Sequence, residues 1–245
     1  MDKAILLDNV SIVLVDTKTP ANIGATARCM MNMGLSHLVL VRPPKDPSHE
    51  AVKLAAGTDI ILDRMQAFST LREAVADYGL VLGTSRQKGR LRTNIKTPHD
   101  AAYAIIPLLP QHRVAIVFGS EVNGLEREDL ALCHEFISIP SSDAFPSLNI
   151  SHAVMIVAFE LFRASSISFT PNGQELARSE AIEDFYRHLQ KVLVDIAFLD
   201  RNESERMMFT LRQIFGRSRL SKRDVAILRG ILTAVERVAE PPRIN

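Results

Sequence analysis

Three apolar segments of this chain run directly into loops of small, polar and turn-forming residues. They are GLVLGTSR, which ends at Arg86, RVAIVFGSEVNGL, which ends at Leu125, and FISIPSSDAFPSLN, which ends at Asn149. In open α/β sheets, ligands bind beyond the carboxyl ends of the strands, and Gly, Ser and Pro there let main-chain groups approach a small molecule closely. The pattern predicts a site for a small cofactor.

An earlier strand-to-helix junction, DTKTPANIGATARCMMNMGL, carries Asn22, Gly24 and Arg28. Asn22 suits a helix cap and Gly24 suits close helix packing, so both residues also have a purely structural interpretation. Arg28 lies in the middle of the expected helix among apolar neighbours. An arginine at such a position needs an ion pair, a phosphate or a subunit interface as its partner.

Further polar residues lie in the second and third loops. Glu121 follows Gly119, and a carboxylate there could act as a general base or could order the loop by accepting main-chain hydrogen bonds. Ser147 and Asn149 precede a long apolar helix whose first N–H groups need partners, so part of their role is expected to be capping. We expect His152, one turn later, to serve packing or an interface.

Several common chemistries have no signature in the chain. There is no GxGxxG after the first strand and no GxxxxGK[ST], the usual dinucleotide and phosphate-binding motifs. The spacing of His99, His112 and His134 does not indicate a metal site, so no metal is expected. Cys29 and Cys133 form no metal or disulfide pattern and are expected to be buried structural thiols, with redox or nucleophilic roles as the alternative.

Charge is nearly balanced, with a formal net charge of +1, so a nucleic-acid partner would have to be held by a local basic patch. One patch follows the first loop without an acidic residue. A second spans residues 201–245, with ten Arg or Lys against five Asp or Glu. Both can also be solvated surfaces, but the first lies where charge could position phosphates. Its members, the candidate RNA-binding residues, are Arg86, Lys88, Arg90, Arg92 and Lys96.

The elements that would position these residues alternate between strand and helix from SIVLVD onwards. Such alternation, with strands of nearly continuous Val, Ile and Leu, predicts an α/β fold with a mostly parallel sheet covered on both faces. A short strand is expected at ILDRM. Helices are expected over residues 22–33, 50–56, 69–76, 101–109, 127–133 and 148–164.

Beyond this region, SSISFTPNGQE loses its periodicity and indicates a linker. The pattern then becomes wholly helical over residues 181–199, 203–215 and 221–238, with Ser221 and Asp224 as a capping box. Three such helices cannot easily form a core alone, so we expect them to pack on the main domain, a partner subunit or a substrate. The chain has neither a signal peptide nor an apolar run of about 18 residues, which predicts a cytoplasmic protein without a membrane span.

Taken together, NIGATAR, FGSEVNGL and IPSSDAFPSLNISHAV resemble, in the same order, the three motifs of the SPOUT-superfamily RNA 2′-O-methyltransferases. Ser120 and Pro146 stand where the family's motifs vary. The resemblance covers residues 9–165 and includes a helical C-terminal extension. It implies an α/β fold whose mostly parallel sheet ends in a C-terminal deep trefoil knot, followed by a small all-helical extension. The implied division is a methyltransferase domain over 1–165, a linker over 166–178 and the extension over 179–245.

The same resemblance implies S-adenosylmethionine as the cofactor, bound largely by main-chain groups. The implied cofactor contacts are Thr84, Ser85, Arg86, Gly119, Ile139, Pro146, Ser147 and Leu148. The implied catalytic set is Asn22, Arg28, Glu121, Ser147 and Asn149. Because a guanidinium is normally only a donor, Arg28 is expected to bind the phosphate beside the target ribose rather than to remove its proton.

The implied reaction is methylation of a ribose 2′-hydroxyl in tRNA, at cytidine or uridine 32 of the anticodon loop. The family also implies a homodimer in which Arg28 reaches the partner's site. The apolar helix ISHAVMIVAFELF supports a dimer, although an intrachain core is the alternative. Two rival functions stay open: methylation of another tRNA or rRNA nucleotide, and a non-catalytic RNA-binding protein with a vestigial pocket.

Overall fold

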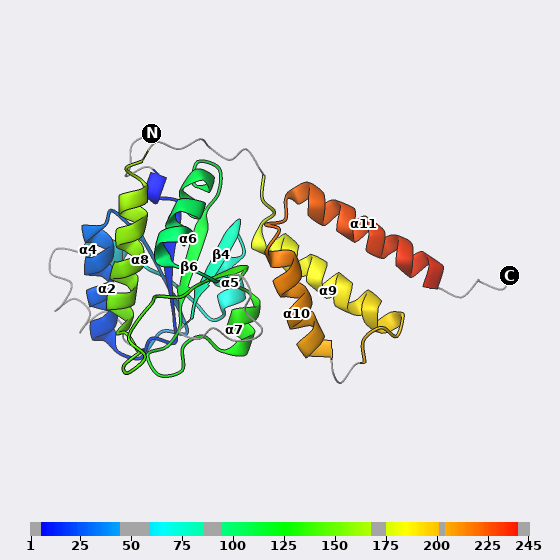
Figure 1. The fold of residues 1–245 in the computed structure, drawn as a ribbon, viewed down its shortest axis with the longest axis horizontal. Helices are drawn as coiled ribbons and strands as arrows, with labels where there is room; N and C mark the ends of the chain where they lie inside the picture. The colour runs from blue at the N-terminus through cyan, green and yellow to red at the C-terminus, as the bar shows by residue number, and fades with distance from the viewer. Residues whose placement is uncertain (1–5, 45–58, 86–94, 168–174, 201–203, 240–245) are drawn as a thin grey trace.

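A seven-stranded sheet with the order β3-β2-β1-β6-β4-β7-β5 forms the centre of the larger part of the protein (Figure 1). The computed structural model describes residues 6–44, 59–85, 95–167, 175–200 and 204–239. All neighbouring strands pair in parallel, which confirms the predicted mostly parallel sheet. The strands are β1 (Val10–Val15), β2 (His37–Val41), β3 (Gln66–Phe68), β4 (Leu80–Thr84), β5 (Ile95–Lys96), β6 (Val114–Phe118) and β7 (Glu135–Ile137).

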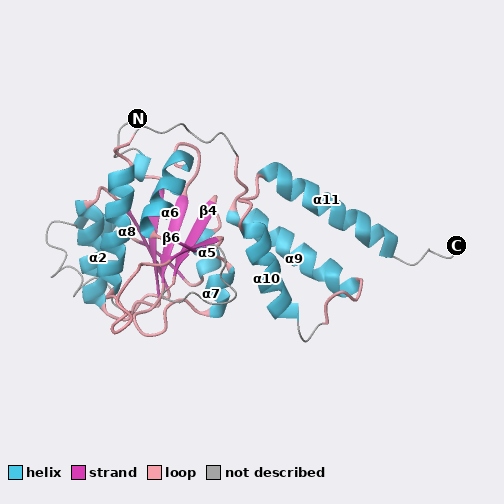
Figure 2. Cartoon of the chain, in the orientation of Figure 1, coloured by secondary structure: helices cyan, strands magenta, loops and turns pink. Residues whose placement is uncertain are grey.

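Helices cover both faces of this sheet (Figure 2). Ile12, Leu82 and Ile116 are buried on one face, under α2, α4, α6 and α8, whereas Val13 and Val117 are buried on the other, under α5 and α7. Successive strand residues point to opposite faces, so a doubly covered strand is apolar throughout. The helices are α2 (Pro20–Asn32), α4 (Asp59–Asp63), α5 (Leu71–Val75), α6 (Pro98–Ile105), continued by the 3₁₀ turn Ile106–Leu108, α7 (Arg127–Ala131) and α8 (Ile150–Ala164).

The expected strand at ILDRM is wrong. Residues Asp59–Asp63 form the short helix α4, in which Ile61 is buried while Ile60 is 50% exposed, and the strand β3 begins only at Gln66. Adjacent residues with opposite exposure occur both in a strand and in a short amphipathic helix. The Ile60–Ile61 pair therefore could not distinguish a strand from a helix. The two-residue strand β5 was not predicted, because two residues carry no periodicity. The helix expected over residues 50–56 lies outside the described residues.

Three further helices form a separate C-terminal group: α9 (Ser179–Asp195), α10 (Ser204–Gly216) and α11 (Lys222–Ala239). They enclose a hydrophobic cluster of their own that includes Phe185, Met208 and Leu232. Their apolar faces converge on one another, and the expectation that they cannot easily form a core alone stays a prediction. The expectation that they pack on the main domain is confirmed, since Phe209 of α10 joins the core of the second sheet face.

Two buried carboxylates join the C-terminal helices to the sheet. Glu183 of α9 pairs with Arg212 of α10 and with Arg72 of α5, the latter at 2.8 Å. Glu135, at the start of β7, accepts from Nε of Arg219 at 2.6 Å. Burial alone would raise the pKa of both carboxyl groups, but these cations outweigh it and lower the pKa in each case. Both carboxylates are thus held in the charged form at the joint.

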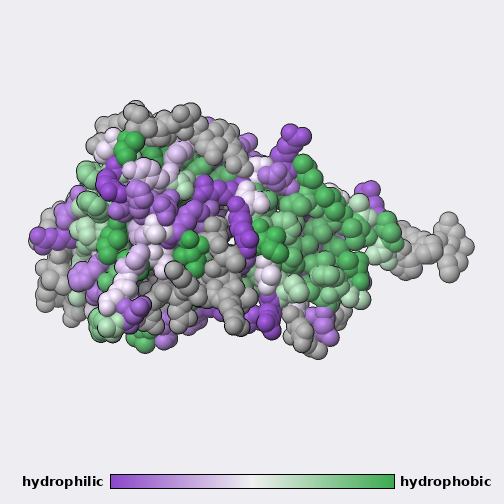
Figure 3. Space-filling view, viewed as in Figure 1, coloured by the Kyte–Doolittle hydropathy of each residue, from purple (hydrophilic) through white to green (hydrophobic). Residues whose placement is uncertain are grey.

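The predicted capping box at the start of α11 is present: Asp224 N donates to Ser221 Oγ at 3.1 Å, and Ser221 N donates to Asp224 Oδ2 at 2.9 Å. Figure 3 shows apolar residues gathered over the C-terminal helices, where Ile227 and Ile231 of α11 and Ile214 of α10 are more than half exposed. Within the described ranges, no helix has the length and apolar character needed to cross a membrane.

Candidate active site

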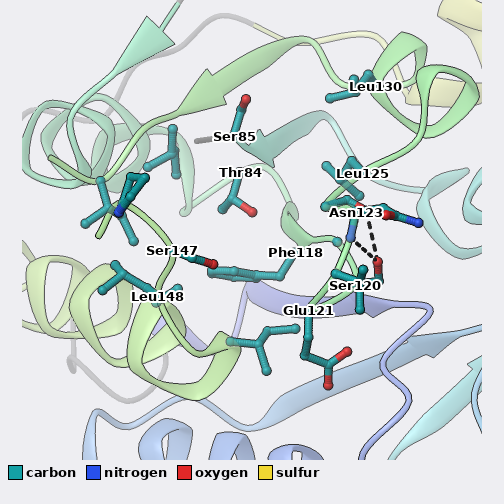
Figure 4. Close-up of a pocket in the computed structure, with 18 residues that line it drawn as sticks. Thr84, Ser85, Phe118, Ser120, Glu121, Asn123, Leu125, Leu130, Ser147 and Leu148 are labelled. Carbon is teal, nitrogen blue, oxygen red and sulfur yellow. Dashed lines mark hydrogen bonds between the residues drawn. The ribbon is translucent and has the colours of Figure 1, made fainter. Parts of the chain in front are cut away.

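A cavity of about 270 Å³ opens at the carboxyl ends of β4, β6 and β7 (Figure 4). These strands lie side by side in the sheet, so the three loops that follow them meet at one edge. The cavity is lined by Thr84, Ser85, Phe118, Gly119, Ser120, Glu121, Val122, Asn123, Gly124, Leu125, Leu130, Ile137, Ile139, Pro146, Ser147, Leu148, Ile150 and Ala153. The three strand-to-loop junctions singled out in the sequence therefore do converge on one site.

The loop after β6 closes on itself through two glycines. Ser120 N donates to Gly124 O at 3.1 Å, and Gly124 N donates back to Ser120 O at 3.0 Å. Gly124 has a φ of +70°, a left-handed conformation that favours glycine. A Cβ built at Gly119 would lie 2.1 Å from the carbonyl carbon of Gly124. This turn therefore has no room for a side chain at Gly119. At Gly119 and Gly124 the cavity wall consists of main chain.

Most of the predicted cofactor contacts line this cavity. Thr84, Ser85, Gly119, Ile139, Pro146, Ser147 and Leu148 do so, whereas Arg86 lies outside the described residues. The main chain of the first loop is held in place: Ser85 N donates to Ile137 O at 2.9 Å and Thr84 Oγ1 donates to Val117 O at 3.0 Å. Their role as cofactor contacts stays a prediction.

Beside the cavity, three of the five predicted catalytic residues form one hydrogen-bonded array. Asn22 Nδ2 donates to Glu121 Oε1 at 2.8 Å, and Asn149 Nδ2 donates to Asn22 Oδ1 at 3.0 Å. Glu121 Oε2 also accepts from the main-chain N of Lys18 at 3.3 Å. Asn22 and the main chain of Lys18 thus donate to the carboxylate, whereas Asn149 donates to the amide oxygen of Asn22. Glu121 therefore ties the loop after β6 to the β1–α2 junction that carries Lys18 and Asn22, which agrees with the loop-ordering interpretation of this carboxylate.

Asn149 has a second task at the start of α8. Its Oδ1 accepts from Ser151 N at 2.9 Å and from Ser151 Oγ at 2.7 Å, which makes Asn149 the N-cap of the helix. One side chain thus caps α8 with its oxygen and holds Asn22 with its nitrogen. The expected capping role is confirmed for Asn149. Ser147 lies two residues earlier, in the cavity wall.

Arg28 does not reach this array within the same chain. Its side chain is exposed on α2, and the described residues offer it no ion pair. Asn22 and Arg28 are six residues apart, which places them about 120° apart around the helix. Asn22 faces the cavity edge, so Arg28 faces elsewhere. The described residues thus supply no ion pair for Arg28, and its expected contact with a phosphate or a subunit interface stays a prediction.

The basic stretch after the first loop is described only at its end. Residues 86–94 lie outside the described residues, so the predicted contacts of Arg86, Lys88, Arg90 and Arg92 cannot be placed. Lys96 is placed, and its Nζ pairs with Glu135 Oε2 at 2.8 Å. Lys96 is therefore part of the joint with the C-terminal helices.

The histidines and cysteines have structural roles where their contacts are described. His134 Nδ1 accepts from Val81 N at 3.2 Å, and desolvation by burial lowers its pKa to about 4. Cys133 is buried as expected, whereas Cys29 is only half-buried; burial raises the pKa of the Cys29 thiol. In the described part of the chain, no group of His, Cys, Asp and Glu is arranged to hold a metal ion.

Sequence reasoning missed several residues of the cavity. Leu125 and Leu130 close one side, and Ile150 and Ala153, from the first turn of α8, close another. For Ile150 and Ala153, the sequence signal that could have identified them is their position at the apolar start of the helix that directly follows the third loop. Lys18 was also missed, because it contributes its main-chain N–H to Glu121, and no side-chain pattern reports a main-chain donor.

The fold and the site thus define a parallel α/β protein whose main-chain loops enclose a cavity beside an amide–carboxylate array. A family model described as the SpoU rRNA Methylase family matches residues 9–159, and one described as the C-terminal domain of the tRNA methyltransferase TrmJ matches residues 180–244. The chain belongs to the SpoU methylase family, which confirms the resemblance found in the sequence.

Named relatives match over nearly the whole chain. The chain is 39% identical to the tRNA (cytidine/uridine/adenosine-2′-O-)-methyltransferase TrmJ of Pseudomonas aeruginosa (strain UCBPP-PA14), over 96% of each protein. It is 35% identical to the tRNA (cytidine/uridine-2′-O-)-methyltransferase TrmJ of Escherichia coli O6:K15:H31, over 94% of this chain and 96% of that protein. The crystal structure of TrmJ from Z. mobilis ZM4 superposes with a TM-score of 0.81 at 32% identity, covering 92% of this chain and 98% of that one.

Proposed function

We propose that this protein transfers a methyl group from S-adenosylmethionine to a ribose 2′-hydroxyl of tRNA, at cytidine or uridine 32 of the anticodon loop. The observation that carries the proposal is the cavity at three strand ends with the Glu121–Asn22–Asn149 array at its edge. Family membership and relatives named as tRNA 2′-O-methyltransferases support the reaction and its substrate. Position 32 rests on the resemblance stated from the sequence.

The residues of the cavity fit such a cofactor. Gly119 lines the cavity without a side chain, so its main chain can lie directly against a ligand, and Phe118, Ile137 and Ile139 supply apolar contact for an adenine ring. The bound sulfonium would supply an already activated methyl group, so neither metal nor redox chemistry is required of the protein. We propose that the chain forms the trefoil knot of its family around these loops.

The task of the protein is then to hold the attacking hydroxyl in line with the methyl carbon and to exclude water. In such a transfer the O–CH₃ bond would form as the S–CH₃ bond breaks, and the hydroxyl proton would pass to water at the open side of the cavity once the methyl group has been transferred. Asn22, Asn149 and Glu121 form a fixed polar edge against which the ribose can be oriented. Ser147, in the cavity wall, completes the set. Arg28 binds the neighbouring phosphate, as a permanent cation suits.

We propose that the protein works as a homodimer in which Arg28 serves the partner's cavity. Two observations support this. Arg28 points away from the cavity of its own chain and has no intrachain ion pair among the described residues. On the neighbouring helix α8, Ile156, Phe159 and Phe162 are between 36% and 48% exposed, and Met31 of α2 is 40% exposed. A second copy would cover this apolar face.

The basic stretch over residues 86–94 and the C-terminal helices would hold the body of the tRNA through its phosphates. We propose the division into a methyltransferase domain (1–165), a linker (166–178) and a helical extension (179–245), acting on tRNA in the cytoplasm. The separate hydrophobic cluster of α9–α11 supports that division. Because Lys96 is already paired with Glu135, the phosphate contacts fall to the other basic residues. Binding should weaken steeply as salt rises.

The proposal is tested by incubating the protein with labelled S-adenosylmethionine and, in parallel, with unmodified total tRNA and with unmodified total cellular RNA that includes ribosomal RNA. Label should enter tRNA, and tRNA affinity should fall by more than tenfold between 50 and 200 mM salt. Label in ribosomal RNA but not in tRNA would favour the first rival function. Cofactor binding with no transfer to any cellular RNA would favour a non-catalytic RNA-binding protein. Salt-independent binding would contradict the phosphate contacts.

A further inference from the structure

Arg42, the residue directly after β2, ties together three segments at the edge of the sheet that carries the site. Its Nε donates to Asp16 Oδ2 at 2.8 Å, and its Nη2 donates to Asp129 Oδ2 at 2.5 Å. Asp16 directly follows β1, and Asp129 lies in α7, the helix that follows the glycine loop. One guanidinium therefore ties the end of β1 and helix α7 to the end of β2.

The contact with Asp16 leads to the predicted catalytic array. Asp16 Oδ1 accepts from Lys18 Nζ at 3.3 Å, and the main-chain N of Lys18 donates to Glu121 Oε2 at 3.3 Å. Glu121 in turn accepts from Asn22. Asp16 thus holds the side chain of Lys18, and the main-chain N–H of the same residue donates to Glu121.

The backbone at both ends of this ion pair is strained. Asp16 has a φ of 54° and Arg42 a φ of 51°, in the left-handed region that residues other than glycine rarely adopt. Such strain persists where the surrounding contacts over-determine it, and it concentrates at functional sites. The ion pair between Arg42 and Asp16 is only partly buried, so its own contribution to stability is small and does not by itself explain two strained residues at the ends of neighbouring strands.

We propose that Arg42 is a positioning residue for the methyl transfer: through Asp16 and the loop that carries Lys18, it sets Glu121 against Asn22. The inference rests on the proposed function. It assigns Arg42 no contact with cofactor or RNA. Arg42 and Asp16 should therefore act as one unit, and their loss should lower the rate of the bound complex rather than the affinity for the cofactor.

The test compares Asp16→Asn, Arg42→Gln and the double variant. Asparagine is nearly isosteric with aspartate and tolerates positive φ, so Asp16→Asn removes the charge and leaves the turn. Each single variant should lower kcat by tenfold or more, with KM for S-adenosylmethionine within about twofold of the parent, because a small displacement of aligned groups is costly. The double variant should fall no more than about threefold below the lower single variant, as expected for coupled residues.

A matched control is Arg72→Gln. Arg72 of α5 also pairs with a carboxylate on another element, Glu183 at 2.8 Å, but it lies in neither basic patch and does not line the cavity, and Glu183 keeps its pair with Arg212. It should keep kcat within about threefold at saturating tRNA. Arg42→Gln alone leaves the buried Asp129 carboxylate without its partner and could fail to fold for that reason. In that case the double variant Arg42→Gln, Asp129→Asn replaces it, because it also removes the charge of Asp129.

A second readout does not depend on methyl transfer. In protein labelled with ¹⁵N-asparagine, the side-chain amide signal of Asn22 should move in Asp16→Asn and Arg42→Gln and stay in place in Arg72→Gln. If the parent protein transfers no methyl group, the proposed function is refuted. The Asn22 amide signal then still tests whether Arg42 positions the array. Unchanged Asn22 signals, or kcat within twofold of the parent in both single variants, would overturn the inference.

Discussion

The two roles of Asn149 can be separated by two substitutions. Asn149→Asp keeps an oxygen where Oδ1 accepts from Ser151 N, so the cap of α8 survives, but it replaces the Nδ2 donor that faces Asn22 Oδ1. Asn149→Ala removes both contacts. If the array at the cavity edge orients the ribose, both variants should lose methyl transfer, whereas only the alanine variant should lose much stability.

The magnitudes follow from the contacts. Loss of an N-cap side chain costs about 1 kcal/mol, and loss of one ordinary hydrogen bond costs about as much again. Asn149→Ala should therefore lower the free energy of unfolding by about 2 kcal/mol. Asn149→Asp retains the cap and gains a favourable charge at the helix N-terminus, so it should lose less than about 1 kcal/mol. In a chain of this size, 1 kcal/mol corresponds to about 2–4 °C in Tm.

The assay is thermal unfolding of both variants, followed by kcat and KM for labelled S-adenosylmethionine at saturating tRNA. Both variants should show kcat at least tenfold below the parent, and the aspartate variant should unfold within about 4 °C of it. An aspartate variant with parental kcat would refute the reasoning, because the donor to Asn22 would then be dispensable. An inactive aspartate variant that is as unstable as the alanine variant would show that the cap was not preserved.

Three further predictions concern the cavity, the joint and the predicted phosphate contact. Gly119→Ala places a Cβ 2.1 Å from the Gly124 carbonyl carbon, so the loop must open, and calorimetry should show at least tenfold weaker binding of S-adenosylmethionine; unchanged affinity would mean that the cavity is not the cofactor site. His134, with its pKa lowered to about 4, stays neutral in the folded protein while the unfolded chain protonates below pH 6.5, so stability falls as pH falls through this window. At one pKa unit per 1.36 kcal/mol, urea unfolding of the parent should lose about 2 kcal/mol more between pH 7 and pH 5 than that of His134→Asn, and equal losses would contradict the assignment. Arg28→Ala should abolish transfer and leave cofactor affinity nearly intact; a large loss of affinity would mean that Arg28 belongs to the cavity.

The sequence predicted the sheet and the meeting of three loops because these depend on strong, local signals. Each long strand is a continuous apolar run, and parallel strands bring their carboxyl ends to one edge. The short elements were less accessible: β5 has two residues, and ILDRM fits either a strand or the end of a short helix. For elements this short, tertiary contacts decide the conformation.

The candidate site was predictable in its residues but not in its connections. Motif order identified Asn22, Glu121 and Asn149, but not the direction of the hydrogen bonds between them. Arg42 was invisible as part of the site, because its links to Asp16 and Asp129 join segments that are 26 and 87 residues apart. Lys96 looked like one member of a basic patch until its pairing with Glu135 was seen.

The most direct test of the proposed function is the identity of the methylated nucleoside. Unmodified tRNA is incubated with the protein and S-adenosylmethionine, digested with nucleases and analysed by mass spectrometry, with the Arg28→Ala variant as the control. The account predicts 2′-O-methylcytidine or 2′-O-methyluridine in the fragment that contains position 32, and none with the variant. A methyl group on a base, or on a ribose at any other position, would contradict it.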